Sequence, residues 1–189
     1  VILAEEYPSV GIVGSYSLLG EKVVFDGLPY NKKVIPGKEM CRMRFLGGPY
    51  IFGTPTSVLY RSDIIRKRGV FYNDPSPSAD TSVCYEILKD YDFGFIHQVL
   101  SYARVHENSI SSYQMRRLNT YISSHLDNLV KYGHYYLDND ELKNKIGEWL
   151  KHYYNFLSKN VFRRRDKEFW DFHKLKLEES GYPFNRIKL

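Results

Sequence analysis

The sequence predicts an α/β fold, in which a mixed sheet with flanking helices is followed by an α-helical C-terminal extension. Up to about residue 112, short runs of β-branched and aromatic residues alternate with turn formers, which is typical of strands joined by tight loops. Beyond that point, apolar residues recur at helical spacing over long stretches. We therefore expect two domains, residues 1–112 and residues 113–189.

The elements of the first domain follow from local residue choice. Residues 1–6 are good helix formers, and they stop before Tyr7-Pro8, because proline disfavours helix in the residue that precedes it. Pro36 suits the first turn of a helix, where its missing N–H is not needed. The expected order is a helix over residues 1–6, strands over 10–19 and 21–25, a helix over 36–45, a strand or strand-turn over 50–60, a helix over 62–68, a helix from residue 80 and a strand over 93–105.

The extension is expected to hold three helices. Asp138 and Asp140 are the expected caps of the second helix, and the third should run over residues 165–180, with Gly181 and Pro183 as its stop. The apolar stripes of the first two helices are Leu118, Tyr121, Ile122, His125, Leu129 and Tyr132, and Leu142, Ile146, Trp149, Tyr153 and Leu157.

Composition narrows the class of protein. No run of 18 apolar residues is present, and residues 1–10 lack the basic start and apolar stretch of a signal peptide, so we expect a cytoplasmic chain with no membrane span. Cys41 and Cys84 lie far apart without a metal-type partner at short spacing. We expect two buried thiols rather than a zinc site or a disulfide framework.

The net charge of +5 lies entirely in the extension. Residues 1–112 hold 12 basic against 12 acidic residues, and residues 113–189 hold 15 against 10. This surplus suits either an anionic partner or a solvated helix face.

The aromatic residues of the extension suggest which anionic partner to expect. Basic residues within 163–176 flank Phe169, Trp170 and Phe172, a mixture suited to lipid headgroups. Peripheral contact with the inner face of a membrane is therefore expected. A nucleic-acid partner is not, because no base-reading motif is present.

Four segments in order resemble the second half of family-2 glycosyltransferases of the GT-A fold. They are Gly53–Arg61, Gly69–Tyr72, Ala79–Asp80 at the entry to a helix, and Arg104–Ser111. The resemblance covers residues 1–112 and does not extend to the helical tail. It implies a GT-A-like sheet and an inverting transfer of a sugar from a nucleotide-sugar donor to an acceptor hydroxyl, in cell-surface polysaccharide or glycolipid synthesis.

The resemblance implies that Asp80 is the catalytic base. The family's base is an acidic residue at this loop-to-helix position, within a motif that reads Glu-Asp in many relatives. Ala79 stands here in place of the first acid, and one carboxylate within reach of the acceptor hydroxyl is sufficient for the chemistry. The alternative role for Asp80 is a plain helix N-cap, and a helix terminus should also keep the carboxylate ionised and lower its basicity.

Five further residues are candidate substrate contacts. By resemblance, Gly53, Thr54 and Thr56 would form the floor of the acceptor site, although a simple strand bulge gives the same pattern. Arg104 and His106 match positions near the donor diphosphate, and His106 is a candidate metal ligand, with loop fixation as the alternative role of both.

The family's metal site has no counterpart in this sequence. Relatives bind Mn²⁺ or Mg²⁺ and the diphosphate with a D-x-D motif in an N-terminal half, which would fall upstream of Val1. We expect the full-length enzyme to need that divalent metal, this segment alone to be inactive, and the acceptor to be a saccharide or a lipid-linked saccharide. The alternative function is a non-catalytic basic module that contacts an anionic membrane or nucleic acid, or that forms a homodimer through its aromatic stripes.

Overall fold

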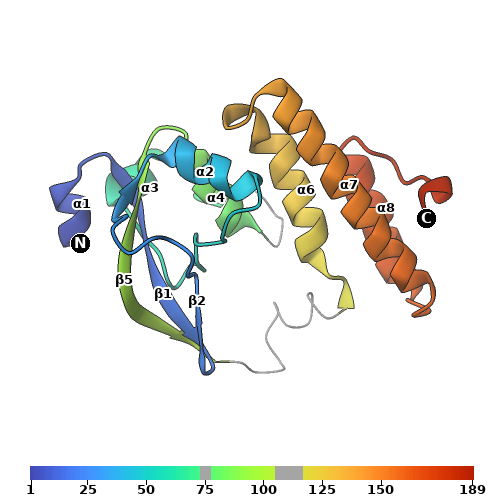
Figure 1. Ribbon diagram of the computed structural model, residues 1–189, viewed down its shortest axis with the longest axis horizontal. Coiled ribbons are helices and arrows are strands. Elements are labelled where there is room, and N and C mark those ends of the chain that lie inside the picture. Colours follow the sequence, from blue (N-terminus) through green and yellow to red (C-terminus); the bar gives the residue numbers. More distant parts are fainter. Residues whose placement is uncertain (73–77, 105–116) are drawn as a thin grey trace. The chain divides into compact units, whose positions relative to one another are not determined.

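The computed structural model describes residues 1–72, 78–104 and 117–189. The chain divides into two compact units, Val1–Val105 and His106–Leu189, so the expected boundary at residue 112 lies outside the described residues. The first unit is a mixed sheet with flanking helices, which confirms the α/β class (Figure 1). Its elements are α1 (Ile2–Glu6), β1 (Val10–Leu19), β2 (Lys22–Val24), β3 (Val34–Ile35), α2 (Gly37–Phe45), β4 (Leu59–Tyr60), α3 (Ser62–Lys67), α4 (Ala79–Ile87) and β5 (Asp92–Ala103).

The sheet is organised around β1 and β5, which pair in parallel and lie side by side along their length in Figure 1. The strand order is β2-β1-β5-β3, and β2, β3 and β4 all pair antiparallel with their neighbours. The first half of β1 is buried throughout, because it has a neighbour on each edge and helices over the sheet.

The strand or strand-turn expected over residues 50–60 is interrupted at Gly53 as expected, but residues 50–53 do not form a strand. Only β4 is extended, and the backbone before it turns at Gly53, whose φ of +78° suits glycine and not a strand. Ile51 and Phe52 are nevertheless fully buried. Their apolar character reflects burial in the core and not a strand. The strand β3 was not predicted, because two residues are too few to show an alternating pattern.

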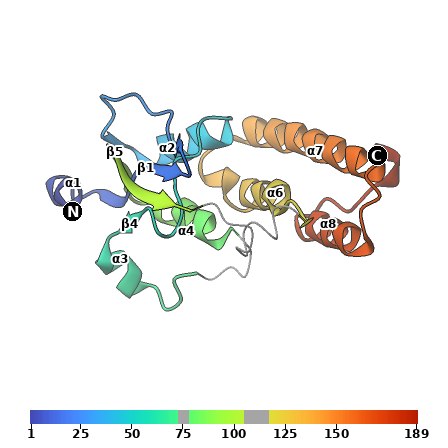
Figure 2. The same ribbon diagram turned by 90° about the horizontal axis from the view of Figure 1, so that it is seen from below.

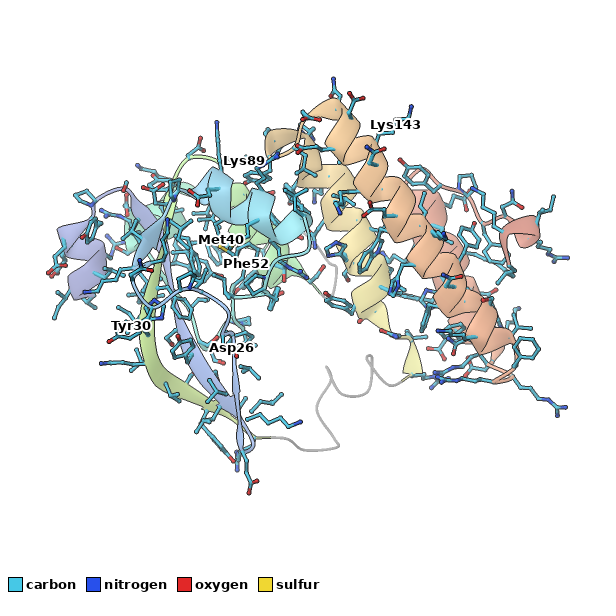
Figure 3. All side chains as sticks on the ribbon, in the orientation of Figure 1. Asp26, Tyr30, Met40, Phe52, Lys89 and Lys143 are labelled. Atoms are coloured by element: carbon cyan, nitrogen blue, oxygen red, sulfur yellow. The ribbon has the colours of Figure 1, made fainter. Side chains whose placement is uncertain are left out.

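Aromatic packing fixes α4 against α2 and the sheet. The Tyr85 ring of α4 stacks on Phe45 of α2 with 4.5 Å between centroids, and its edge meets Phe52 at 5.2 Å. Phe52 in turn contacts Phe93 of β5 at 6.1 Å. Met40 and Phe52 lie in the interior between α2 and the sheet (Figure 3). This packing sets the position of the α4 N-terminus, where Asp80 lies.

The second unit is helical, as expected. Its elements are α6 (Thr120–Tyr132), η1 (Gly133–Tyr135), α7 (Asn139–Val161), α8 (Lys167–Glu179) and η2 (Arg186–Lys188). Figures 1 and 2 show α6 alongside α7. The buried core residues of this unit are Ile122, Leu126, Tyr153, Tyr154, Leu157, Phe169 and Leu177.

Side-chain caps define where α7 and α8 begin. Asp138 accepts from Glu141 N while Glu141 accepts from Asp138 N, which is a capping box. Asp140 is therefore the second residue of α7 and not its cap. Asp166 caps α8 by accepting from Phe169 N at 3.0 Å.

The three aromatic side chains that were expected to meet lipid headgroups are less accessible than that role requires. Phe169 is fully buried in the helical core, and Trp170 and Phe172 are half-buried. Their spacing is that of a helix face directed inward, and sequence periodicity does not separate that face from a lipid-facing one. In the described part of the chain no helix has the length and apolar content that crossing a membrane requires.

Candidate functional site

Asp80 is the second residue of α4, in its first turn. Ser78 occupies the N-cap position and makes no side-chain cap hydrogen bond, so Asp80 is not itself the N-cap residue. The Asp80 carboxylate instead accepts from the backbone N–H of Thr81 at 2.8 Å. The carboxylate therefore binds one of the first free backbone amides of α4, which is the contact that the capping alternative expects, and the helix orients it.

Burial raises the pKa of Asp80 above its ordinary value, although the hydrogen bonds from Thr81 act in the opposite direction. The expected effect of the helix terminus is present, since the backbone N–H groups of Asp80 and Thr81 lower this pKa, but desolvation of the charged form outweighs it. A carboxylate with a raised pKa is a better proton acceptor than an exposed one.

Tyr50 connects the Asp80 region to the segment expected to bind the acceptor. Its hydroxyl lies 3.0 Å from Thr81 Oγ1 and donates to the carbonyl oxygen of Gly53 at 3.0 Å. The backbone N–H of Thr81 also donates to Asp80, so the Tyr50 side chain links Gly53 to the residue that holds the Asp80 carboxylate. The structure thereby brings together two regions that lie 27 positions apart in the sequence.

The segment after Gly53 forms a closed polar turn. Ser57 N donates to the carbonyl oxygen of Thr54 at 2.9 Å, and Thr54 N donates to Ser57 Oγ at 2.7 Å. The hydroxyls of Thr54 and Thr56 lie 3.2 Å apart on an exposed surface, where they can hydrogen-bond a polyol. A side chain at Gly53 would place its Cβ 2.5 Å from Ser57 Oγ, so the turn requires glycine.

Three neutral acids surround Asp80. Burial is the main cause that raises the pKa of Tyr50, Tyr60 and Cys84, and the charge of Asp80 adds to the shift in each. All three therefore stay protonated at neutral pH. Among these four groups, Asp80 is the acid whose ordinary pKa lies below neutrality.

Sequence reasoning missed Tyr50 and Arg44 as members of this site. The Arg44 guanidinium of α2 lies over the Tyr50 ring, 5.5 Å from its centroid, and donates to the carbonyl oxygen of Gly48 at 3.1 Å. It places a positive charge beside Tyr50. The run Gly47-Gly48-Pro49-Tyr50 reads as a turn, and no local pattern shows that the Tyr50 hydroxyl reaches α4.

Arg104 is not joined to this site by a described contact. Arg104 is exposed and directly follows β5, and no hydrogen bond or ion pair of the described residues links it to Asp80. His106 lies outside the described residues. Across the residues with a described position, no group of three or more His, Cys, Asp or Glu is placed to hold a metal ion.

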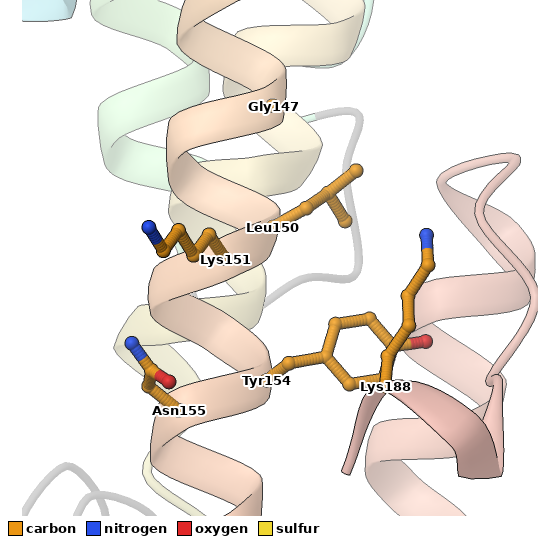
Figure 4. Close-up of a pocket in the computed structure, with 6 residues that line it drawn as sticks. All are labelled: Gly147, Leu150, Lys151, Tyr154, Asn155 and Lys188. Atoms are coloured by element: carbon orange, nitrogen blue, oxygen red, sulfur yellow. The ribbon is translucent and has the colours of Figure 1, made fainter.

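A separate cavity of about 380 Å³ lies in the second unit. Figure 4 shows it between one face of α7 and Lys188, which crosses the Tyr154 ring. Lys188 Nζ lies 5.8 Å from the Tyr154 ring centroid, and Tyr154 Oη accepts from Asn185 N at 2.8 Å. These contacts tie the C-terminal segment to α7, which is a packing role.

No protein-family model matches the chain, and neither does any curated protein or solved structure.

Proposed function

We propose that the chain is the acceptor-side part of an inverting glycosyltransferase of family 2, with a GT-A-like sheet and Asp80 as general base. The observation that carries this proposal is the contact chain from Gly53 through Tyr50 and Thr81 to Asp80. It supports a site in which the expected acceptor surface and the expected base adjoin.

The proposed chemistry assigns distinct roles to these residues. Asp80 takes the proton of an acceptor hydroxyl while that oxygen attacks the anomeric carbon of the nucleotide sugar, and the nucleoside diphosphate leaves with its bonding electron pair. Burial raises the pKa of Asp80, which favours proton transfer to it. Thr54 and Thr56 present exposed hydroxyls to the acceptor sugar, and Tyr50 holds their turn against α4.

The proposal leaves donor binding to residues outside this site. A divalent metal would stabilise the charge of the leaving diphosphate. The described residues offer no ligand cluster for it, so none of the steps assigned to this chain passes through a metal.

Substitution of Asp80 in the full gene product tests the proposal. Asp80→Asn keeps the size of the side chain and its acceptor for Thr81 N but removes the base, so sugar transfer should fall on the order of 10²–10⁴-fold. Transfer is measured with UDP- and GDP-sugars and a panel of saccharide acceptors, and donor affinity is measured separately. Asp80→Ala is the matched variant that also loses the hydrogen bond.

Two results would remove the catalytic assignment. One is an Asp80→Asn protein that transfers sugar at the wild-type rate while Asp80→Ala only unfolds earlier. The other is a wild-type protein that transfers no sugar from any of these donors.

A further inference from the structure

The connection between α7 and α8 presents an apolar side chain inside a basic surface. Phe162 is 88 % exposed and Val161 is 48 % exposed, next to the exposed side chains of Lys159, Arg163 and Arg164. Residues 159–164 are called the helical tip. Single exposed apolar residues are common, but an aromatic ring this exposed between cations is the composition of an interfacial membrane contact.

The tip is a built structure that holds Phe162 outward. Arg165 turns inward, where its Nε donates to Asn160 Oδ1 at 2.8 Å and its guanidinium lies 5.1 Å from the Phe169 ring centroid. Asn160 in turn donates to the carbonyl oxygen of Phe156 at 2.8 Å. These contacts, at Asn160 before Phe162 and at Arg165 after it, fix the connection on both sides of the exposed ring.

Arg164 adopts a backbone conformation that favours glycine. Its φ is +48°, in the left-handed region, where a side chain other than glycine is strained. This turn ends α7, since Arg164 N donates to the carbonyl oxygen of Val161 at 3.2 Å, and it keeps a cation beside Phe162.

The positive charge of the tip is not cancelled by the acids that follow it. Residues 155–165 contain four basic residues and no acidic residue. The first acidic residues after it in the sequence are Asp166 and Glu168, and both form ion pairs with Arg117. The dipole of α7 accounts for a cation such as Lys159 at its C-terminus, but it gives no reason for an exposed Phe162.

We propose that the helical tip docks the protein on an anionic lipid surface, with the Phe162 ring inserted at the headgroup level and Lys159, Arg163 and Arg164 against lipid phosphates. Each cation near an anionic leaflet adds attraction that salt weakens, and the buried ring adds an apolar contribution. This docking does not depend on the proposed transferase activity.

Vesicle sedimentation of the whole chain tests the tip. The protein should sediment with phosphatidylcholine vesicles that contain phosphatidylglycerol, much less with pure phosphatidylcholine, and less again as salt is raised. Phe162→Gln should weaken binding about tenfold, and Arg163→Gln with Arg164→Gln about thirtyfold. All these side chains are exposed, so unfolding curves should match the wild type.

Leu175→Gln is the matched control on α8. Leu175 is 52 % exposed and lies between two lysines, but Lys174 pairs with Asp171 and Lys176 pairs with Glu179, so this surface has little net charge. Its binding should equal that of the wild type. An equal loss from Leu175→Gln and Phe162→Gln would move the contact away from the tip and overturn the proposal.

A Phe162→Trp variant reports insertion directly. The emission of the introduced tryptophan should shift to the blue on vesicle binding and be quenched by brominated lipid. The emission of the wild-type protein, from Trp149 and Trp170, is subtracted as background, since both pack against the helical core. Absence of quenching would overturn the insertion. Binding to a duplex DNA oligonucleotide without sedimentation on anionic vesicles would show a different class of polyanion and would likewise overturn it.

Discussion

The hydroxyl of Tyr50 lies 3.0 Å from Thr81 Oγ1, which places a loop residue in contact with the first turn of α4. The same hydroxyl donates to the carbonyl oxygen of Gly53. One side chain therefore satisfies a buried backbone acceptor and sets the distance between the 54–57 turn and the α4 N-terminus. This makes Tyr50 a positioning residue and not a proton acceptor, since its raised pKa keeps it protonated.

Tyr50→Phe should separate these two regions. The change leaves the ring and its packing in place but removes both hydrogen bonds, so the first unit should lose about 1–3 kcal/mol of stability. In the full gene product, KM for the acceptor should rise more than kcat falls. Tyr60→Phe is the control, because the Tyr60 hydroxyl contacts only the Cys84 sulfur, at 3.6 Å, among the hydrogen bonds described. Equal effects of the two variants would contradict the positioning role.

Asp80→Asn should stabilise the first unit while it removes the base. The pKa of Asp80 is raised by folding, so the folded chain binds more protons than the unfolded chain just above pH 3.8, and stability falls as pH rises through that window. At neutral pH the buried charge is a net cost that asparagine lacks. Hydrogen exchange of the α4 amides at pH 7 should be slower in Asp80→Asn. Faster exchange would mean that the carboxylate stabilises the helix after all.

The sequence predicted where Asp80 lies but not what surrounds it. A turn-rich loop before a helical pattern is a local signal, and α4 begins at Ala79, one residue before the expected start. The raised pKa results instead from burial among Tyr50, Tyr60 and Cys84, which come from three separate segments. Such an environment depends on tertiary packing, which no local pattern describes.

Gly53→Ala should destabilise the turn after Gly53. The φ of +78° costs about 1–2 kcal/mol for alanine, and the added Cβ meets Ser57 Oγ. Gly69→Ala is the matched control, since no atom lies within 4 Å of its added Cβ, and it should change the unfolding midpoint little. Thermal unfolding of the two variants provides the comparison. A Gly53→Ala protein as stable as Gly69→Ala would show that the turn has another conformation.

The helical unit was the most predictable part of the chain, for a physical reason. Periodicity, caps and stop signals are local, so the sequence indicates α7 from Asp138 and the end of α8 from Gly181 and Pro183. Periodicity does not say what the inward face meets. The burial of His173, for example, results from tertiary packing of α8 against the Tyr153 and Phe156 rings of α7.

His173 is fully buried, with both ring nitrogens in hydrogen bonds. Its Nδ1 lies 2.6 Å from Tyr153 Oη, and its Nε2 lies 2.8 Å from the carbonyl oxygen of Leu118. A carbonyl can only accept, so Nε2 carries the proton and Nδ1 accepts from the tyrosine hydroxyl. Protonation of Nδ1 would remove that acceptor inside an aromatic core.

Acid should therefore unfold the second unit through His173. Burial lowers the pKa of His173 from 6.5 to about 4, so between these values the unfolded chain binds more protons and stability rises with pH. The stability held at pH 7 should fall by about 3 kcal/mol as pH approaches 4.

Both tryptophans, Trp149 and Trp170, lie in this unit, so denaturant titrations followed by their fluorescence report on it alone. His173→Gln should remove most of the pH dependence, and His152→Gln, at an exposed site, should leave it unchanged. A slope that persists in His173→Gln would assign the acid sensitivity to other groups.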